Sequence, residues 1–375
     1  MKILVITLHH VRNFGSMLQT YATQETLQGL GHEVEIIDFV PRGLTLKFGI
    51  QSIKKSNNIL NNIIRKIAVL ITFSDRQVTM LKFMKKNICL TKKSYSSFFE
   101  LLHNPPEADA YISGSDQIWN TQNNNLPEDI KAYYLDFVPE GKKRIAYASS
   151  IGKQDFDEKE KEEVKGHLEK FDHVSVREIQ AVKMLEDIGI TNVHHVLDPT
   201  LLLTKQQWSQ FLGNYTKKID PYIFIYNLNR NQRIKEFARK LSKEEGLKII
   251  NFSDTFDFIK GAKNRIHNSA YDFIFYICNA EYVITDSFHG TAFSINLSKQ
   301  FVTFAAPKYN SRIESILNLF NLKERMVENG RDPCDIIKKK IDYAKIQNIL
   351  IEERVKSEEY LRQALSNNKS FGDQL

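Results

Sequence analysis

The sequence is poor in cysteine and carries none of the common cofactor or metal signatures. Its 375 residues include three cysteines, Cys89, Cys278 and Cys334, which lie far apart. This spacing gives neither a disulfide framework nor the closely paired ligands of a structural zinc site. The chain also lacks a Walker A loop, a GxGxxG turn, an HExxH helix and a GxSxG elbow. We therefore expect no metal and no cofactor, and a reducing compartment fits the cysteine content.

Long apolar runs and a leader are missing as well. The apolar run "IAVLITF" at residues 67–73 is far too short to span a bilayer. The opening stretch "MKILVITL" lacks the basic region, the long apolar core and the cleavage site of a signal peptide. It has the composition of a first strand instead. We therefore expect a cytoplasmic protein.

Positive charge is concentrated in one segment. The net charge is +7, yet residues 42–93 alone hold twelve Lys or Arg against the single acid Asp75, a local charge of +11. Isoleucine and leucine recur there at roughly helical spacing between Ile50 and Leu70. A basic amphipathic helix can rest on an anionic membrane surface, whereas a solvated helix that covers the core is the simpler alternative. Nucleic acid is disfavoured as a partner, because interleaved aromatic residues and known binding motifs are missing.

Stretches typical of strands and helices alternate along the chain in two series. Such alternation predicts parallel sheets with helices on both faces. The first series occupies residues 1–215, with the basic segment inserted, and a stretch of linker composition follows near Gly213–Pro221. The second series occupies residues 216–335, and residues 336–375 mix both charges at helical spacing. We predict an α/β fold with two doubly wound domains around a cleft, and a terminal helix that packs back across them.

Ligands of such folds bind outside the carboxyl ends of the strands, so the turns that follow strands are the candidate sites. In the first turn, "HHVRNFGSMLQTYA", Ser16 and Gln19 have capping-box spacing, which predicts that the helix begins at Ser16. Gly15 lets the backbone come close to whatever lies above it. An anion or a sugar could bind here, although such loops are more often only structural. The polar residues at the strand end are His9, His10, Arg12 and Asn13.

A second polar group follows the strand in "YISGSDQIWN". Asp116 and Gln117 can bond to sugar hydroxyls while the ring of Trp119 stacks on a pyranose. Capping of a following helix by Ser115 or Asp116 explains the same residues without a ligand. Both interpretations stay open at this point.

The stretch "HVSVREIQAV" combines a capping pattern with an arginine. Ser175 and Glu178 have capping-box spacing and need no function. Arg177, placed between them in a first helical turn, would oppose the helix dipole unless an anion lies nearby. A surface salt bridge is the alternative. Asp198, in "LDPTLLL", has the character of a turn residue that ends a strand.

The stretch "ITDSFHG" delivers a histidine to a helix start. Asp286 or Ser287 would cap the helix, which leaves His289 in its first turn. Exposed N–H groups and the positive end of the dipole favour a bound phosphate or carboxylate at this position. A histidine there can act as an acid or a base near neutral pH. A structural histidine bonded to a backbone carbonyl is the alternative, and the polar neighbours favour function.

Taken together, these stretches resemble the polysaccharide pyruvyl transferase family over residues 1 to about 320. Each motif is weak alone, whereas their number and order make the resemblance fairly specific. The stretches are, in chain order, "NFGSMLQTYA", "ADAYISGSDQIWN", "RIAYASSIG", "SVREIQAVKMLEDIGI", "VLDPTLL", "ITDSFHGTAFSI" and "SRIESILNLF".

The resemblance implies two Rossmann-like domains similar to the GT-B glycosyltransferase fold. It also implies transfer of the carboxyvinyl group of phosphoenolpyruvate to two hydroxyls of a sugar, which gives a pyruvate ketal and phosphate. The acceptor would belong to a cell-surface glycan, such as a capsule or exopolysaccharide, or to its precursor. Phosphoenolpyruvate would be a substrate, with no cofactor. The N-terminal domain is then expected to bind the acceptor and the C-terminal domain the donor.

The family's donor-site histidine and arginine correspond to His289 and Arg177. Some members have an Arg-Leu-His run where this chain has Ser287, Phe288 and His289, so Arg312 is the candidate for the missing positive charge. His289 and Asp116 are then the expected catalytic residues. The expected donor-binding residues are Arg177, Ser287, Gly290 and Arg312. The expected acceptor-binding residues are Asn13, Gly15, Ser16, Gln117 and Trp119.

Two other functions fit the same pattern. A nucleotide-sugar glycosyltransferase on the two-domain plan would bind a nucleoside diphosphate in the cleft. A non-catalytic glycan-binding protein would bind sugar without turnover. A fold alone does not separate these three functions.

Overall fold

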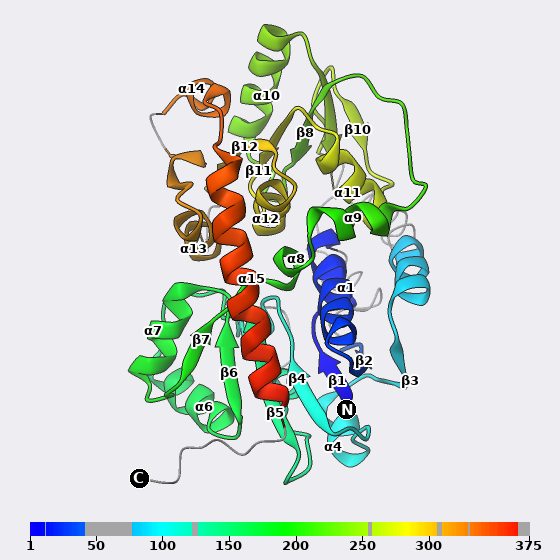
Figure 1. The fold of residues 1–375 in the computed structure, drawn as a ribbon, viewed down its shortest axis with the longest axis vertical. Helices are drawn as coiled ribbons and strands as arrows, with labels where there is room; N and C mark the ends of the chain where they lie inside the picture. Colours follow the sequence, from blue (N-terminus) through cyan, green and yellow to red (C-terminus); the bar gives the residue numbers. More distant parts are fainter. Residues whose placement is uncertain are drawn as a thin grey trace, which may run out of the picture.

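Two parallel β-sheets with helices between and around them form the protein (Figure 1). The computed structural model describes residues 1–11, 13–41, 77–121, 127–253, 257–305, 310–328 and 331–366. The two parallel sheets and their alternating helices confirm the predicted α/β class with two Rossmann-like units.

The first sheet has seven strands, and the chain enters it in the middle. Strand β1 (Lys2–Ile6) consists of the apolar run "KILVI" and is buried from Ile3 onward, as expected of a central parallel strand covered on both faces. It pairs in parallel with β2 on one side and β4 on the other. In spatial order the strands are β3 (Leu90–Tyr95), β2 (Glu33–Phe39), β1, β4 (Ala110–Ser113), β5 (Lys143–Ser149), β6 (His173–Val176) and β7 (Val193–His195).

The second sheet has six strands in a corresponding order. Strand β8 (Tyr222–Tyr226), with the sequence "YIFIY", is buried throughout and pairs in parallel with β9 and β11. In spatial order the strands are β10 (Lys263–Arg265), β9 (Lys248–Phe252), β8, β11 (Tyr282–Thr285), β12 (Gln300–Phe304) and β13 (Met326–Val327). In both sheets the strand order reverses beside the first strand, which is the place where doubly wound folds bind their ligands.

Helices cover the faces of both sheets and fill the space between the two. Those associated with the first sheet are α1 (Phe14–Gly29), α4 (Phe98–His103), α5 (Pro127–Tyr133), α6 (Glu158–Leu168) and α7 (Ile179–Asp187). Helices α8 (Pro199–Leu202) and α9 (Lys205–Leu212) lead to the second sheet. The others are α10 (Gln232–Glu245), α11 (Ala270–Cys278), α12 (Phe288–Asn296), α13 (Ser311–Leu319), the 3-10 turn η2 (Lys323–Arg325), α14 (Pro333–Lys338) and α15 (Tyr343–Leu365).

One apolar core joins the two halves of the molecule. It includes side chains from α1, α8, α11 and α12, among them Leu18, Leu201, Phe273 and Phe293. Phe14 at the start of α1 stacks on Phe273 with ring centroids 5.4 Å apart. Packed aromatic rings therefore hold the start of α1, in the first half of the molecule, close to α11 in the second half.

Helix α15 runs along both halves of the molecule (Figure 1). Its Tyr360 hydroxyl donates to the carbonyl of Ala146 in the first sheet at 2.9 Å. Its Arg354 donates through Nη2 to the Asn296 amide oxygen on α12 at 2.8 Å. The terminal helix thus fastens the two sheets to each other.

Most of the basic segment lies outside the described residues. This applies to residues 42–76, and therefore to the apolar pattern from Ile50 to Leu70; residues 77–87 are helical. Among the helices that the structure describes, none combines the length and the apolar character needed to cross a membrane.

Candidate active site

A buried cluster of charged side chains lies where the carboxyl ends of the two sheets face each other. Arg177 follows β6, its side chain is fully buried, and it is bonded to carboxylates on both sides. Nη1 donates to Asp198 Oδ2 at 2.7 Å, and Nη2 lies 3.4 Å from Asp116 Oδ1. Nε lies 3.4 Å from Glu178 Oε1, and the guanidinium carbon lies 4.4 Å from the ring centroid of Phe288. Arg177 is therefore the centre of the cluster, with its charge compensated by acids.

The capping box expected around Arg177 is wrong. Helix α7 begins at Ile179, one residue after Glu178, so Arg177 is not in a helical turn and does not oppose a dipole. The Ser175 hydroxyl donates instead to the carbonyl of Ala146 at 2.8 Å. Three buried carboxylates, rather than an anionic ligand, account for the arginine at this position.

Asp198 has two functions that a turn assignment does not reveal. Its Oδ1 caps α8 by accepting from the backbone N–H of Thr200 at 3.0 Å, as a turn residue would. Its Oδ2 accepts from Arg177 at 2.7 Å and from the Ser115 hydroxyl at 3.0 Å. The same oxygen lies 3.9 Å from His289 Nε2. Asp198 therefore connects the arginine of the first sheet to the histidine of the second.

His289 lies in the first turn of α12, as predicted, and is 4% exposed. Its Nε2 atom is buried and has no hydrogen-bond partner among the described residues. A buried polar atom without a partner costs free energy, so its retention suggests that a ligand completes the site. The structural alternative, a bond to a backbone carbonyl, finds no support at Nε2.

Gly15 lies directly against His289. A Cβ atom built on Gly15 would be 2.0 Å from His289 Nδ1, closer than two unbonded atoms can lie. The sequence predicted that this glycine allows a close approach, and the group that approaches it is the imidazole ring from the other sheet. The contact fixes the position of His289 relative to the start of α1.

Replacing Gly15 by alanine tests this contact. We expect Gly15→Ala to lower the free energy of unfolding by about 1–3 kcal/mol, because the methyl group must displace the ring. Gly29→Ala, in the same helix, is the matched control, since its Cβ would meet no atom within 4 Å. Denaturant unfolding of both variants gives the comparison. Equal stability of the two variants would contradict the contact.

Arg312, on α13, is the second guanidinium of the site. The side-chain amide of Gln117 faces it, and in the orientation that satisfies both groups the amide oxygen lies 2.7 Å from Nη1 and 2.9 Å from Nε. In the described part of the chain no carboxylate is ion-paired with Arg312. Burial and the neighbouring Arg177 lower the pKa of Arg312 to about 10, so it remains a cation at pH 7. A substrate anion would therefore find Arg312 less compensated than Arg177.

Burial and the charges of the cluster lower the pKa values of His289, Asp116 and Asp198. Burial lowers the pKa of His289 from its ordinary value, and Arg177 and Arg312 act in the same direction, although Asp198 and Asp116 oppose them. The pKa values of Asp116 and Asp198 are lowered despite burial, because Arg177 stabilises both carboxylates. His289 is therefore neutral and the two aspartates are ionised near pH 7.

Asp116 is held by three donors. Besides Arg177, the backbone N–H of Gln117 donates to Oδ1 at 2.8 Å, and the Ser16 hydroxyl donates to Oδ2. The backbone of Asp116 has φ of 78°, a region that aspartate tolerates better than most residues. No helix follows directly among the described residues, so the capping alternative for Ser115 and Asp116 is wrong.

The first helix starts earlier than its pattern predicts. Helix α1 begins at Phe14, and Asn13 is its N-cap, accepting from the Gly15 N–H at 2.8 Å. The capping box of Ser16 and Gln19 is therefore wrong, since Ser16 lies inside the helix and bonds to Asp116. Arg12 lies outside the described residues. Asn13 positions the helix start, while Ser16 contributes its hydroxyl to the cluster.

Trp119 does not offer a stacking surface. Its side chain is fully buried, its ring stacks on Tyr134 with centroids 5.4 Å apart, and its indole N–H donates to the carbonyl of Tyr133 at 3.3 Å. The prediction that Trp119 stacks on a sugar is therefore wrong, because its ring is packed inside the hydrophobic core. An aromatic residue close to polar residues in sequence can point to the opposite side of the chain.

The start of α12 is capped by Ser287, which accepts from the Gly290 N–H at 3.4 Å. Asp286 has a different function: its two oxygens accept from the backbone N–H groups of Leu228 and Asn229, at 2.7 and 3.0 Å. Gly290 is required by packing, because a Cβ there would lie 2.4 Å from Thr285 Oγ1. The predicted residues Ser287 and Gly290 thus shape the helix start that carries His289.

The sequence interpretation missed three members of the cluster. Asp198 has the sequence pattern of a turn residue, Glu178 that of a cap and Ser115 that of a possible cap. Each follows a strand of the first sheet, at the carboxyl edge where doubly wound folds bind their ligands. Their position at this edge is the sequence signal for function, whether or not a capping pattern also explains them.

Comparison with known proteins gives one family and one fold. The family model described as Polysaccharide pyruvyl transferase matches residues 13–306. No curated protein matches the chain in sequence.

Several solved structures are similar to the chain at low identity. A UDP-N-acetylglucosamine 2-epimerase has a TM-score of 0.51 and 10% identity, covering 100% of this chain and 98% of its own. The Methanocaldococcus jannaschii UDP-GlcNAc 2-epimerase in complex with UDP-GlcNAc and UDP has a TM-score of 0.50 and 13% identity, covering 98% and 100%. The E. coli heptosyltransferase WaaC with ADP has a TM-score of 0.42 and 11% identity, covering 94% and 100%. The two epimerases share the GT-B-type plan of two Rossmann-like domains, and such similarity shows the fold alone.

Proposed function

The chain belongs to the polysaccharide pyruvyl transferase family, and we propose that it transfers the carboxyvinyl group of phosphoenolpyruvate to two hydroxyls of a sugar. The product would be a pyruvate ketal on a cell-surface polysaccharide or its precursor, with release of phosphate. Family membership supports a transferase that acts on a polysaccharide. The observation that carries the proposal at the site is His289 Nε2, which is buried without a hydrogen-bond partner among the described residues.

The proposed donor site combines a cation with a helix start. Phosphoenolpyruvate carries a carboxylate and a phosphate, which require fixed positive charge and oriented N–H donors. We assign the donor mainly to Arg312 and to the first turn of α12, at Ser287, Gly290 and His289. Arg177, which is paired with Asp116 and Asp198, would position these carboxylates and add its field to the site.

The proposed acceptor site lies on the first sheet. The Ser16 hydroxyl donates a hydrogen bond to Asp116, and a sugar hydroxyl could bind the same carboxylate in the same way. The lowered pKa of Asp116 suits it to accept hydrogen bonds rather than to abstract protons. We therefore assign Asp116 and Gln117 to hydroxyl binding, with Asn13 and Gly15 shaping the loop beside them.

In the proposed reaction, a proton adds to the methylene carbon of phosphoenolpyruvate, and a sugar oxygen bonds to the carbon that bears the phosphate. The bond between that carbon and the phosphate oxygen then breaks, and the second hydroxyl closes the ketal ring. The two hydroxyl protons balance the one taken up by the methylene carbon and the one carried away with phosphate. His289, neutral at pH 7, can accept a hydroxyl proton and return it. Holding both hydroxyls in place would contribute much of the rate.

Phosphate release tests this function. The full chain is incubated with phosphoenolpyruvate and a panel of lipid-linked and nucleotide-linked sugars, and inorganic phosphate is measured. We expect release that depends on one class of acceptor. Release of a nucleoside diphosphate from a sugar nucleotide, with no use of phosphoenolpyruvate, would favour a glycosyltransferase instead. Sugar binding without either release would favour a glycan-binding protein.

Replacing Arg312 tests the donor assignment. We expect Arg312→Gln to raise the KM for phosphoenolpyruvate about tenfold to a hundredfold, because a charged hydrogen bond contributes about 1.5–3 kcal/mol. Arg239→Gln, on the solvent-facing side of α10, is the matched control and should leave KM unchanged. Steady-state kinetics with the donor varied give the comparison. An unchanged KM in Arg312→Gln would remove Arg312 from the donor site.

We further propose that the basic segment 42–93 contacts an anionic membrane surface, where a lipid-linked acceptor would be found. Its local charge of +11 supports the proposal. Reversing the charges of Lys54, Lys55, Arg65 and Lys66, all outside the described residues, is expected to weaken binding to anionic liposomes in a sedimentation assay. If the parent protein does not sediment with such liposomes, the membrane contact is refuted.

A further inference from the structure

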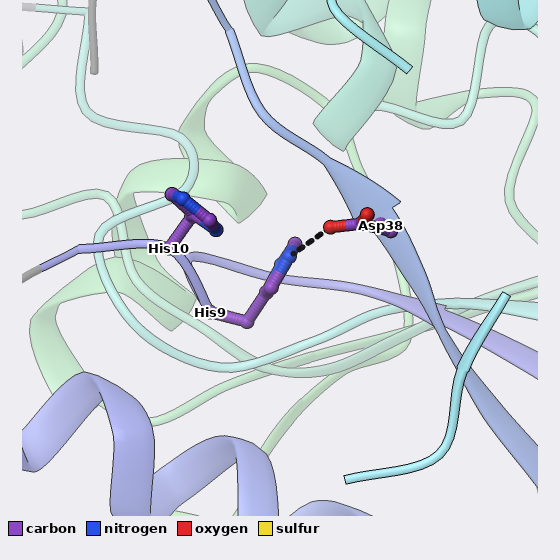
Figure 2. Close-up of side chains that lie close together, drawn as sticks. All are labelled: His9, His10 and Asp38. Carbon is purple, nitrogen blue, oxygen red and sulfur yellow. Dashed lines mark hydrogen bonds and ion pairs between the residues drawn. The ribbon is translucent and has the colours of Figure 1, made fainter. Parts of the chain in front are cut away.

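Two histidines and an aspartate come together away from the Arg177 cluster, and we propose that they bind a divalent transition-metal ion of the Zn²⁺ class. His9 and His10 lie just beyond the end of β1, and Asp38 lies on the neighbouring strand β2 (Figure 2). Parallel pairing of β1 with β2 brings these groups to one sheet edge. Two imidazoles and one carboxylate form a ligand set that zinc commonly uses when a further position is left open.

The separation of the candidate ligand atoms fits a shared ion. His9 Nε2 lies 3.2 Å from Asp38 Oδ1. Ligands bound tetrahedrally to zinc at about 2.0–2.1 Å lie roughly 3.3 Å from each other. One atom from each of the three residues falls within 4.8 Å of the other two. Two ligands are therefore already spaced as a metal-bound pair, and an atom of His10 lies within 4.8 Å of both.

His9 bonds to the backbone through Nδ1, which leaves its Nε2 atom facing the Asp38 carboxylate. Its Nδ1 lies 3.2 Å from the carbonyl oxygen of Thr7, which can only accept a hydrogen bond, so Nδ1 carries a proton. Nε2 then faces Asp38 Oδ1 at 3.2 Å, and in the tautomer with its proton on Nδ1 this nitrogen offers a lone pair that can bind a cation together with the carboxylate. A ring bonded to a backbone carbonyl through its other nitrogen is also the usual state of a metal-binding histidine.

The site is fixed on one side and open on the other. The His9 side chain is fully buried, whereas Asp38 is 21% exposed and His10 is half-buried. Solvent, and with it an ion, can thus reach the site at Asp38 and His10. Thr7 also donates through its hydroxyl to the carbonyl of Ser115 at 2.7 Å, which connects the His9 loop to the strand end that carries Asp116. Sequence spacing did not predict the site, because Asp38 is 28 residues from His10 along the chain.

The alternative is a protonated His9 that simply pairs with Asp38, and metal titration separates the two. The full-length chain, without a polyhistidine tag and treated with a chelator, is titrated with Zn²⁺ by calorimetry and with Co²⁺ by visible absorption. A Cys89→Ser background removes the exposed thiol as a source of binding. We expect one ion per chain and a rise in Tm on zinc addition.

Variants assign the binding to these residues. His10→Ala and Asp38→Asn are each expected to weaken zinc binding at least about tenfold and to abolish the rise in Tm. His103→Ala, which removes an exposed histidine on α4, is the matched control and should bind as the parent does. The experiment needs no transferase activity, so its outcome is independent of the proposed function. Absence of saturable binding in the parent, or equal affinity in the parent and His10→Ala, would overturn the proposal.

Discussion

Replacing His289 by glutamine is expected to lower kcat by about 10²–10⁴-fold while the protein remains folded, because the variant keeps the volume of the side chain but cannot transfer a proton. The ring nitrogen Nε2 is buried, lies 3.9 Å from Asp198 Oδ2 and has no hydrogen-bond partner in the described structure. Removal of the imidazole therefore breaks no hydrogen bond at Nε2, and we expect the variant to fold. Turnover with phosphoenolpyruvate and circular dichroism measure the two effects separately.

The pH dependence of the parent enzyme sharpens the same prediction. Burial lowers the pKa of His289 below its ordinary value, so the ring is neutral at pH 7. If the neutral ring accepts the hydroxyl proton, kcat falls as the pH drops through this lowered pKa, which lies below about 6.5. The residual activity of His289→Gln should lack this acid limb. His173→Gln, a change at a histidine of β6, is the control and should retain both the rate and the limb. A His289→Gln variant that unfolds, or that turns over at the parental rate, would contradict the assignment.

Replacing Arg177 by methionine is expected to destabilise the protein by about 3–5 kcal/mol at pH 7, because three buried carboxylates, those of Asp116, Glu178 and Asp198, lose their partner. Asp198 and Asp116 lie 2.7 and 3.4 Å from the guanidinium, and the Arg177 side chain is fully buried. In the parent, Arg177 keeps the pKa values of both aspartates below their ordinary values. The two groups therefore contribute stability that is present above about pH 4 and is lost as the pH falls through the lowered values.

The sign of the pH effect reverses in the variant. Without the guanidinium, burial raises the pKa values of Asp116 and Asp198, so these groups take up protons in the folded state as the pH falls. The difference in unfolding free energy between parent and Arg177→Met should thus shrink from pH 7 towards pH 4. Denaturant unfolding across this range measures it. Adding Asp198→Asn to Arg177→Met should restore part of the loss. A loss below about 0.5 kcal/mol at pH 7 would show that the cluster does not depend on Arg177.

Much of the fold could be predicted from the sequence, because parallel sheets leave a strong local signal. Apolar runs such as "KILVI" and "YIFIY" are buried on both faces and alternate with helices, and the chain repeats this pattern. The position of His289 in a first helical turn was predictable for the same reason. A strand that leads directly to a capping serine and a histidine places all three within a few residues.

The candidate site was harder to predict, because its contacts join residues that are distant along the chain. Local patterns for capping explained Ser16 and Glu178, yet tertiary bonds to Asp116 and Ser150 use these side chains instead. One carboxylate oxygen of Asp198 accepts from the Thr200 N–H in a turn, and the other accepts from Arg177. The turn alone is enough to explain an aspartate at this position, so the sequence gives no sign of the second bond. Trp119 shows the opposite error, since its ring belongs to the core.

The identity of the bonds formed tests the central claim most directly. Phosphoenolpyruvate labelled with ¹³C at the carbon that bears the phosphate is incubated with the full chain and the acceptor class identified by phosphate release. The product is then analysed by NMR and mass spectrometry. The proposed function predicts that the labelled carbon becomes a ketal carbon bonded to two sugar oxygens and a methyl group, with one phosphate released for each ketal. Phosphate release without label in the sugar, or transfer of a glycosyl group instead, would contradict it.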